Sequence, residues 1–181
     1  MCNGIGGLMK KDLSTFEFKK LSIDSVPLLL EVQEEAFEYV KGNTDFLRRN
    51  TYETLAVCFG GQSEVLGAFD GDKLVAFGIL FVAGEGNENL ARDVDEIEDI
   101  LTSANVKLII VRPEYRGNGL QRELVARLEK TAIDAGFKWL CATVAPTNNW
   151  SYDNFIKSGF VLNKILTKYG GLTRALLVKK I

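Results

Sequence analysis

Residues 106–121 read VKLIIVRPEYRGNGLQ, an apolar run that breaks at a proline and continues through two glycines into a helical pattern. The Val and Ile content is typical of a buried strand. Pro113 has no N–H to donate to a neighbouring strand, so the strand should end near Arg112. Gly117 and Gly119 allow a tight turn and a close approach of a ligand to the backbone. The stretch therefore predicts a strand, a loop and then a helix.

The predicted helix is amphipathic. Apolar residues recur at helical spacing and charged residues occupy the remaining positions. The apolar positions are Leu120, Leu124, Val125, Leu128 and Ala132. We expect Gly136 to end this helix. The two glycines of the loop then lie at the helix N-terminus, where free backbone N–H groups and partial positive charge favour a phosphate group.

The overall composition is that of one globular domain. The chain has 181 residues, 46% of them hydrophobic, and a formal net charge of −2. This near balance of charge argues against a general nucleic-acid binder. No apolar run is long enough to span a bilayer, and the N-terminus lacks an export signal, so we expect a cytoplasmic protein. Residues 1–12 are expected to form a flexible leader, and residues 13–181 a single domain.

Cysteine and histidine usage restricts the chemistry. Cys2, Cys58 and Cys141 show no spacing typical of zinc or of a redox dithiol, so we expect reduced cysteines and no metal. The chain has no histidine, which excludes Ser-His-Asp and Cys-His catalytic units. Any acid–base chemistry must use carboxylates, Tyr, Lys, Cys, the backbone or water.

Patterns elsewhere predict an order of elements. We expect a strand at 16–21, a helix capped by Ser22 or Asp24 and ended by Gly42-Asn43, a short helix at 50–55, a β-hairpin of 65–69 and 74–82, a solvated acidic loop with one short helix at 84–104, a strand at 137–144, a helix at 150–157, and a strand pair at 160–167 and 172–178. Antiparallel strands thus precede a β-α-β unit. This order predicts an α+β (mixed α/β) fold.

Three interpretations of the glycine loop compete on the residues alone. A nucleotide P-loop requires Gly-Lys-Ser/Thr, which Leu120-Gln121-Arg122 does not supply. A dinucleotide fingerprint requires a third glycine and an early β-α-β unit, whereas this unit follows a hairpin. A plain strand-to-helix turn, with Arg116 as a solvated charge, is the simplest interpretation.

Two motifs together carry a family resemblance. Residues 111–120, VRPEYRGNGL, resemble the acetyl-CoA signature Arg/Gln-x-x-Gly-x-Gly/Ala, with Arg116 and Gly119 at its first and fourth positions. Residues 148–160, NNWSYDNFIKSGF, are similar to the Asn-x-x-Ala/Ser…Tyr-x-x-x-Gly-Phe segment of the same family. The family is the GNAT superfamily of N-acetyltransferases. The resemblance implies its acyl-CoA N-acyltransferase fold, a mostly antiparallel twisted sheet flanked by helices, with a splayed parallel strand pair near 106–112 and 139–144.

The resemblance also implies where acetyl-CoA, the co-substrate, is held. The implied contacts are Ile109, Ile110 and Val111 along the pantetheine arm, Arg116, Gly117, Asn118, Gly119, Leu120 and Gln121 around the pyrophosphate, and Asn148 and Ser151 on the opposite side. A neutral amine would attack the thioester directly, and the backbone N–H of Val111 would stabilise the oxyanion.

The chain departs from the family pattern at two positions. Gln121 stands where Gly or Ala is preferred, and its side chain could bond the pyrophosphate or turn away from it. Phe155 aligns with the tyrosine that protonates the leaving thiolate in many members, and Phe has no proton to donate. Tyr152, Tyr169 or no side chain at all could replace that acid, and either tyrosine could equally be an ordinary amphipathic residue.

Two further roles stay open. Glu85, Glu88 and Glu98 precede the central strand, where a general base could arise, although most acids there should face solvent. Arg174 could reach an acidic group of the substrate or form a surface ion pair.

The expected function is that of an acetyl-CoA-dependent N-acetyltransferase acting on a primary amine of a small molecule or peptide. The alternative is a GNAT-fold protein that binds coenzyme A as a sensor or scaffold without turnover. Partners are expected to be the amine acceptor, with no nucleic acid and no membrane, and the chain could also form a homodimer.

Overall fold

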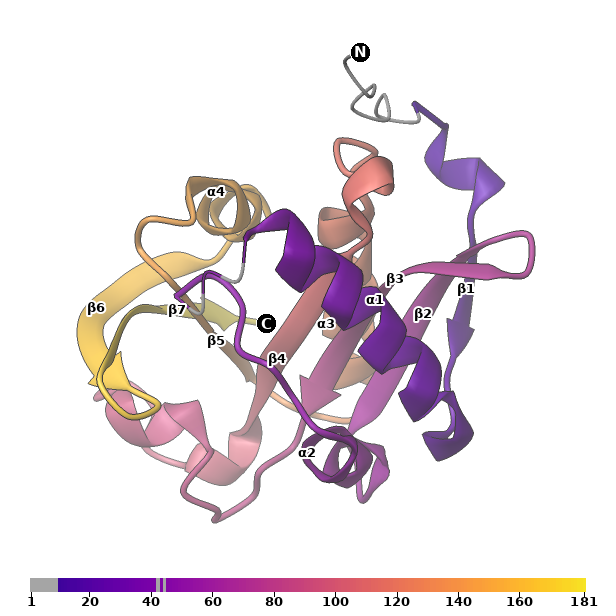
Figure 1. Cartoon of the computed structure of the whole chain (residues 1–181). Helices are drawn as coiled ribbons and strands as arrows, with labels where there is room; N and C mark the ends of the chain where they lie inside the picture. The colour runs from indigo at the N-terminus through magenta and orange to yellow at the C-terminus, as the bar shows by residue number, and fades with distance from the viewer. Residues whose placement is uncertain (1–9, 42, 44) are drawn as a thin grey trace.

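A computed structural model describes residues 10–41, 43 and 45–181. In this part of the chain, strands form one mixed sheet with the order β1-β2-β3-β4-β5-β7-β6 (Figure 1). The strands are β1 (Glu17–Lys20), β2 (Glu64–Asp70), β3 (Lys73–Phe81), β4 (Ser103–Val111), β5 (Trp139–Val144), β6 (Val161–Lys168) and β7 (Leu172–Lys180). The α-helices are α1 (Val26–Tyr39), α2 (Tyr52–Ala56), α3 (Leu120–Asp134) and α4 (Asn149–Lys157). Short 3-10 helices join them: η1 (Leu13–Thr15), η2 (Ile23–Ser25), η3 (Val57–Phe59), η4 (Leu90–Asp93), η5 (Ile100–Thr102) and η6 (Pro113–Tyr115).

The sheet is antiparallel except at its centre. β2 and β3 form the predicted hairpin, and Gly71 in its turn has a φ of 59°. β4 and β5 are parallel, and they pair only from Ser103 to Asn105 with Trp139 to Cys141. Beyond Asn105 the two strands separate (Figure 1). This confirms both the mixed fold and the splayed parallel pair.

Helices cover both faces of the sheet (Figure 1). α3 packs its predicted apolar face, Leu120, Leu124, Val125, Leu128 and Ala132, into the largest core cluster. α1 and α2 cover the opposite face and form a second cluster with β2 and β3. Burying the apolar stripe of each helix against the sheet contributes most of the stability, about 25 cal/mol per Å² of apolar surface.

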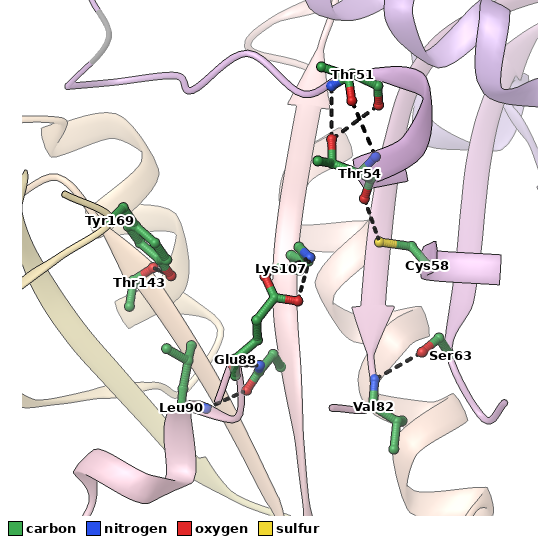
Figure 2. A network of polar contacts seen from close by, with 11 residues as sticks. Thr51, Thr54, Cys58, Ser63, Val82, Glu88, Leu90, Lys107, Thr143 and Tyr169 are labelled. Atoms are coloured by element: carbon green, nitrogen blue, oxygen red, sulfur yellow. Dashed lines mark hydrogen bonds and ion pairs between the residues drawn. The ribbon is translucent and has the colours of Figure 1, made fainter. Parts of the chain in front are cut away.

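The start of α1 differs from the prediction. Neither Ser22 nor Asp24 caps it, because the 3-10 helix η2 occupies residues 23–25 and Ser25 becomes the N-cap, with no side-chain cap bond. Pro27 lies in the first turn, where its missing N–H costs no hydrogen bond. α1 ends at Tyr39, and the predicted stop residue Gly42 lies outside the described residues. α2 forms as predicted, with a capping box between Thr51 and Thr54 (Figure 2).

The acidic segment at 84–104 is not the solvated loop with one helix that the sequence predicted. It contains η4 and η5 and runs into the start of β4. Four of its apolar residues are buried against β5 and β7 and form a third core cluster with Cys141 and Leu176. These residues are Leu90, Ala91, Val94 and Ile97. They recur at helical spacing (i, i+1, i+4, i+7) among acids, but only the short 3-10 helix η4 forms here, and it is packing against β5 and β7 that buries them.

Several other findings bear on the sequence expectations. Of the predicted leader, residues 1–9 and therefore Cys2 lie outside the described part. Within the described end of that leader, the N–H of Lys11 donates to Asn118 Oδ1 (3.0 Å), and its ammonium pairs with Asp70. Cys58 and Cys141 are buried thiols, and burial raises the pKa of Cys141 to about 12. None of the described helices combines the length and the apolar composition that a membrane crossing requires.

Candidate active site

The end of β4 presents backbone groups to the gap beside β5. Arg112 N–H donates to the Val75 carbonyl on β3 (2.8 Å), and Ala76 lies opposite Val111. Because successive peptide groups of a strand point to opposite sides, Ile109 and Val111 direct their N–H groups away from β3, toward the side from which β5 has diverged. Ile110 instead directs its peptide groups to β3 and buries its side chain in the second core cluster.

The glycine loop leads into α3 with its backbone in the left-handed region. Gly117 has a φ of 82° and Gly119 a φ of 78°, and Gly119 is the N-cap of α3. No side chain caps this helix end. The Asn118 side chain holds the loop in place, since its Oδ1 accepts from Lys11 N–H (3.0 Å) and its Nδ2 donates to the Tyr115 carbonyl (3.1 Å). An uncapped helix N-terminus behind two glycines is a favourable seat for an anion.

Arg116, the first residue of the acetyl-CoA signature, lies beside the end of α1. Its guanidinium lies 4.3 Å from the centre of the Tyr39 ring, a cation–π distance. Burial lowers the pKa of Arg116, and Tyr39 opposes this shift. Arg116 is therefore not the solvated charge of the simplest interpretation.

Gln121 turns toward α4. Its Nε2 donates to Ser151 Oγ (3.2 Å), and its Oε1 accepts from Asn154 Nδ2 (3.1 Å). Asn148 Oδ1 accepts from Ser151 N–H (3.3 Å) and so caps the same helix. Gln121 thus joins the starts of α3 and α4, the two elements implied on either side of the cofactor. Asn154 completes this link, and nothing in the sequence had singled it out.

Phe155 and Tyr152 lie on α4 in different surroundings. Phe155 is 5% exposed and packs edge-to-face on Phe160, with ring centres 5.1 Å apart. Tyr152 is half-buried and packs against the largest core cluster. The position aligned with the family's acid is therefore a core aromatic in this chain.

A cavity of about 150 Å³ opens where β4 and β5 separate. We call it the splay cavity. β4 from Asn105 to Leu108 forms one wall, and the loop at 46–50 forms another. Thr143 of β5, Tyr169 of the β6–β7 turn and Arg174 of β7 close it on the far side. The cavity thus adjoins Ile109, the first residue of β4 implied in pantetheine binding.

Tyr169 is the candidate acid that the fold brings to this cavity. Its hydroxyl lies 2.9 Å from Thr143 Oγ1 (Figure 2). Its φ of 56° places a non-glycine residue in the left-handed region, a conformation that stores strain and that occurs often at functional sites. Tyr152, the other candidate acid, does not line the splay cavity.

Of the three candidate bases, Glu88 alone lines the splay cavity. Its carboxylate accepts from Lys107 Nζ at 3.3 Å (Figure 2). Buried Asn105 fixes the backbone of this segment, because its Nδ2 donates to the Glu88 carbonyl (2.8 Å) and its Oδ1 accepts from Leu90 N–H (3.3 Å). Asn105 is a second residue that sequence reasoning missed, since Thr102, Ser103 and Lys107 surround it and it is one polar residue among several.

Comparison with known proteins identifies a family for most of the chain. A family model described as "Acetyltransferase (GNAT) family" matches residues 27–160. Compared one by one with curated protein sequences, the chain matches none.

Solved structures share the fold at low identity. The ribosomal-protein-S18-alanine N-acetyltransferase from Escherichia coli superimposes with a TM-score of 0.70 at 18% identity, over 92% of this chain and 94% of the other. The PaiA N-acetyltransferase from Thermoplasma acidophilum, in complex with coenzyme A, gives 0.66 at 20% identity, over 92% and 99%. The Salmonella typhimurium yncA structure, with its cofactor acetyl-CoA, gives 0.69 at 13% identity, over 92% and 94%.

Proposed function

The chain belongs to the acetyltransferase (GNAT) family, and from this premise we propose that it transfers an acetyl group from acetyl-CoA to a primary amine. The observation that carries the proposal is the separation of β4 from β5 beyond Asn105. It leaves peptide groups of Ile109 and Val111 directed at the gap, and the amide groups of pantetheine can pair with them as a further strand would.

The glycine loop supports a seat for the pyrophosphate of this co-substrate. A Cβ built on Gly117 meets no atom within 4 Å, so the space beside the loop is open. The uncapped N–H groups of α3 lie next to it and favour a negative charge. Backbone groups of residues 116–121 would hold the pyrophosphate, and Asn148 and Ser151 at the start of α4 would lie on its other side.

We propose direct transfer. The amine nitrogen attacks the thioester carbonyl carbon, the C–S bond breaks, the amine loses a proton to a base or water, and the thiolate gains one. A backbone N–H of β4, that of Val111 or that of Ile109 on the same side of the strand, would stabilise the oxyanion. Tyr169 is the better-placed donor to the thiolate, because it reaches the splay cavity and Phe155 has no proton. Tyr152 remains the second candidate.

Thiol release from acetyl-CoA in the presence of a panel of amines tests the proposal. We expect release that depends on the amine and follows saturation kinetics. Tyr169→Phe should lower kcat about 10²-fold or more if its hydroxyl is the acid, while CoA affinity is unchanged. Tyr152→Phe is the matched comparison, and the tyrosine whose loss leaves kcat unchanged is removed from the mechanism.

The second candidate function is a CoA-binding sensor or scaffold without turnover, and buried Phe155 favours it. The two functions share a measurable property, since acetyl-CoA should raise the melting temperature in a concentration-dependent way in both. They differ in turnover. Binding of acetyl-CoA without amine-dependent thiol release would support the sensor and contradict the transferase.

A further inference from the structure

Arg174 is a buried cation that has no carboxylate partner in the described part of the chain. It is 5% exposed and lines the splay cavity. Its Nη1 donates to the Thr173 carbonyl (2.8 Å), and among the described residues no carboxylate lies within 4.0 Å of its guanidinium. The chain's other buried arginine, Arg112, has two carboxylate partners. A buried charge is costly unless it is paired, so Arg174 is set to receive an anion from outside the chain.

A second arginine faces the same aromatic ring. The Arg48 guanidinium lies 4.6 Å and that of Arg174 6.0 Å from the centre of the Tyr169 ring. Across the part of the chain that is described, Arg48 also has no carboxylate within 4.0 Å, whereas its neighbour Arg49 pairs with Glu34 (2.8 Å). Two cations held beside one ring repel each other until an anion lies between them.

The remaining charges of the splay cavity do not neutralise this pair. Lys107 and Glu88 pair with each other at 3.3 Å. Asp45 on the neighbouring loop acts on Arg174, and its charge opposes the lowering of the Arg174 pKa that burial causes, but it forms no ion pair with it. Arg48 and Arg174 therefore leave the cavity with an excess of positive charge next to Tyr169.

The loop that carries Arg48 is tied to α1. Gln33, 1% exposed, accepts from Asn50 N–H (2.8 Å) at its Oε1 and donates to the Asn50 carbonyl (3.1 Å) from its Nε2. These paired bonds fix the loop two residues from Arg48. The arginine therefore projects from a supported backbone, which lowers the cost of ordering it around a ligand.

We propose that Arg174 and Arg48 bind a carboxylate of the acceptor, so that the acceptor is a small amino acid rather than an amine without an acidic group. The inference rests on the proposed acetyl transfer and names its substrate class. Guanidinium groups match the planar carboxylate with paired hydrogen bonds. The cavity, at about 150 Å³, holds the volume of about five waters. An acceptor whose amine and carboxylate lie within a few bonds of each other matches a cavity of this size.

The test compares acceptors that differ only in the carboxylate. Each of the twenty amino acids is assayed for thiol release beside its carboxamide and its decarboxylated amine. We expect at least one amino acid to exceed both of its analogues in kcat/KM by about tenfold or more. Arg174→Gln should lower kcat/KM for that acid about 10- to 100-fold more than for its amide, because only the acid loses a charged hydrogen bond.

Further variants separate binding from folding. Arg48→Gln changes an exposed residue and should reduce the preference for the acid without altering the melting temperature. Arg49→Gln, next in sequence but paired with Glu34, is the matched control and should keep the preference. Amides or decarboxylated amines that react as well as the acids, or a preference that survives both Arg174→Gln and Arg48→Gln, would overturn the proposal.

A readout without turnover keeps the two proposals apart. In the presence of CoA, the preferred amino acid should raise the melting temperature, its amide should not, and Arg174→Gln should abolish the difference. A chain that distinguishes acid from amide in this way, yet releases no thiol with any amine, contradicts acetyl transfer and keeps the carboxylate site. Equal effects of acids and amides contradict the carboxylate site itself.

Discussion

At the scale of single residues, Gly119 combines a backbone role with an electrostatic one. A Cβ at this position would meet Leu13 Cδ1 at 3.6 Å, an ordinary contact, although the φ of 78° disfavours most side chains. Asp and Asn tolerate this conformation better than other residues. Gly119→Asp should lower CoA affinity at least tenfold, because its carboxylate would occupy the helix end meant for the pyrophosphate.

Gly119→Asn is the matched control for this charge. It has nearly the same shape without the charge, so it should retain most of the affinity. CoA titration by calorimetry measures both variants, and melting temperatures check that both fold. Equal CoA affinity of the Asp and Asn variants would remove the pyrophosphate from this loop.

Tyr115 predicts a pH dependence. Its hydroxyl donates to Asp70 Oδ2 (2.9 Å), and burial, followed by this hydrogen bond, raises its pKa to about 12. The unfolded chain releases the same proton near pH 10. The hydrogen-bonded Tyr115 hydroxyl therefore makes its full contribution to the free energy of unfolding below about pH 10. This contribution is lost as the pH rises toward about 12.

The comparison with Tyr115→Phe isolates this effect. The gap in urea midpoint between the natural chain and the variant should be larger near pH 9 than near pH 11, because other groups titrate alike in both. A gap that does not change over this range would show that Tyr115 ionises as easily in the folded chain as in the unfolded one.

At the scale of elements, Gln121 couples α3 to α4. Gln121→Ala and Asn154→Ala should each lower the free energy of unfolding by about 1 kcal/mol, since each removes the same partly buried hydrogen bond. The double variant should then cost less than the sum, by about 0.5 kcal/mol or more. Lys130→Ala, which removes an exposed ion pair with Asp134 on α3, is the control and should cost no more than about 0.5 kcal/mol. Urea unfolding measures these free energies. A double variant that loses the full sum of the two single losses would contradict the coupling of α3 to α4 through Gln121 and Asn154.

Predictability differs between elements for a physical reason. α3 and its five buried positions could be predicted, because a helix that covers a sheet repeats its apolar residues every turn. The burial of the segment at 84–104 could not, although Leu90, Val94 and Ile97 recur at helical spacing, because acids dominate the segment and the strands that bury it, β5 and β7, lie far away in the sequence. The start of α1 was misplaced for a related reason: η2 uses the residues that should have capped the helix.

At the scale of the whole molecule, Arg112 joins the end of β4 to α1 and β3. Its Nη2 lies 2.6 Å from Glu31 Oε1, its Nη1 pairs with Glu35, and its Nε donates to the Leu74 carbonyl (2.7 Å). The arginine side chain is 3% exposed, whereas those of the two glutamates are 57% and 45% exposed. If Arg112 is removed, water can solvate the two glutamates. If the glutamates are removed, little water can reach the guanidinium of Arg112.

This asymmetry predicts unequal costs. Arg112→Met should destabilise the fold by about 1–3 kcal/mol, because the glutamates it leaves behind remain solvated. The double variant Glu31→Ala, Glu35→Ala should cost about 3–5 kcal/mol, because it leaves a buried guanidinium unpaired. Denaturant unfolding of both variants checks the order. A larger cost for Arg112→Met would mean that packing of the arginine stem, not its charge, holds α1 to the sheet.

The sequence by itself determined the strand, the glycine loop and the amphipathic helix, because these features are repeated or adjacent within 106–136 and need no partner to be recognised. With the second motif, they were sufficient for the family. Only the tertiary structure decided that β4 and β5 pair over three residues, that Gln121 faces Asn154, and that Arg48 and Arg174 flank Tyr169. Contacts between residues far apart in the chain depend on strand order and register, which local periodicity does not encode.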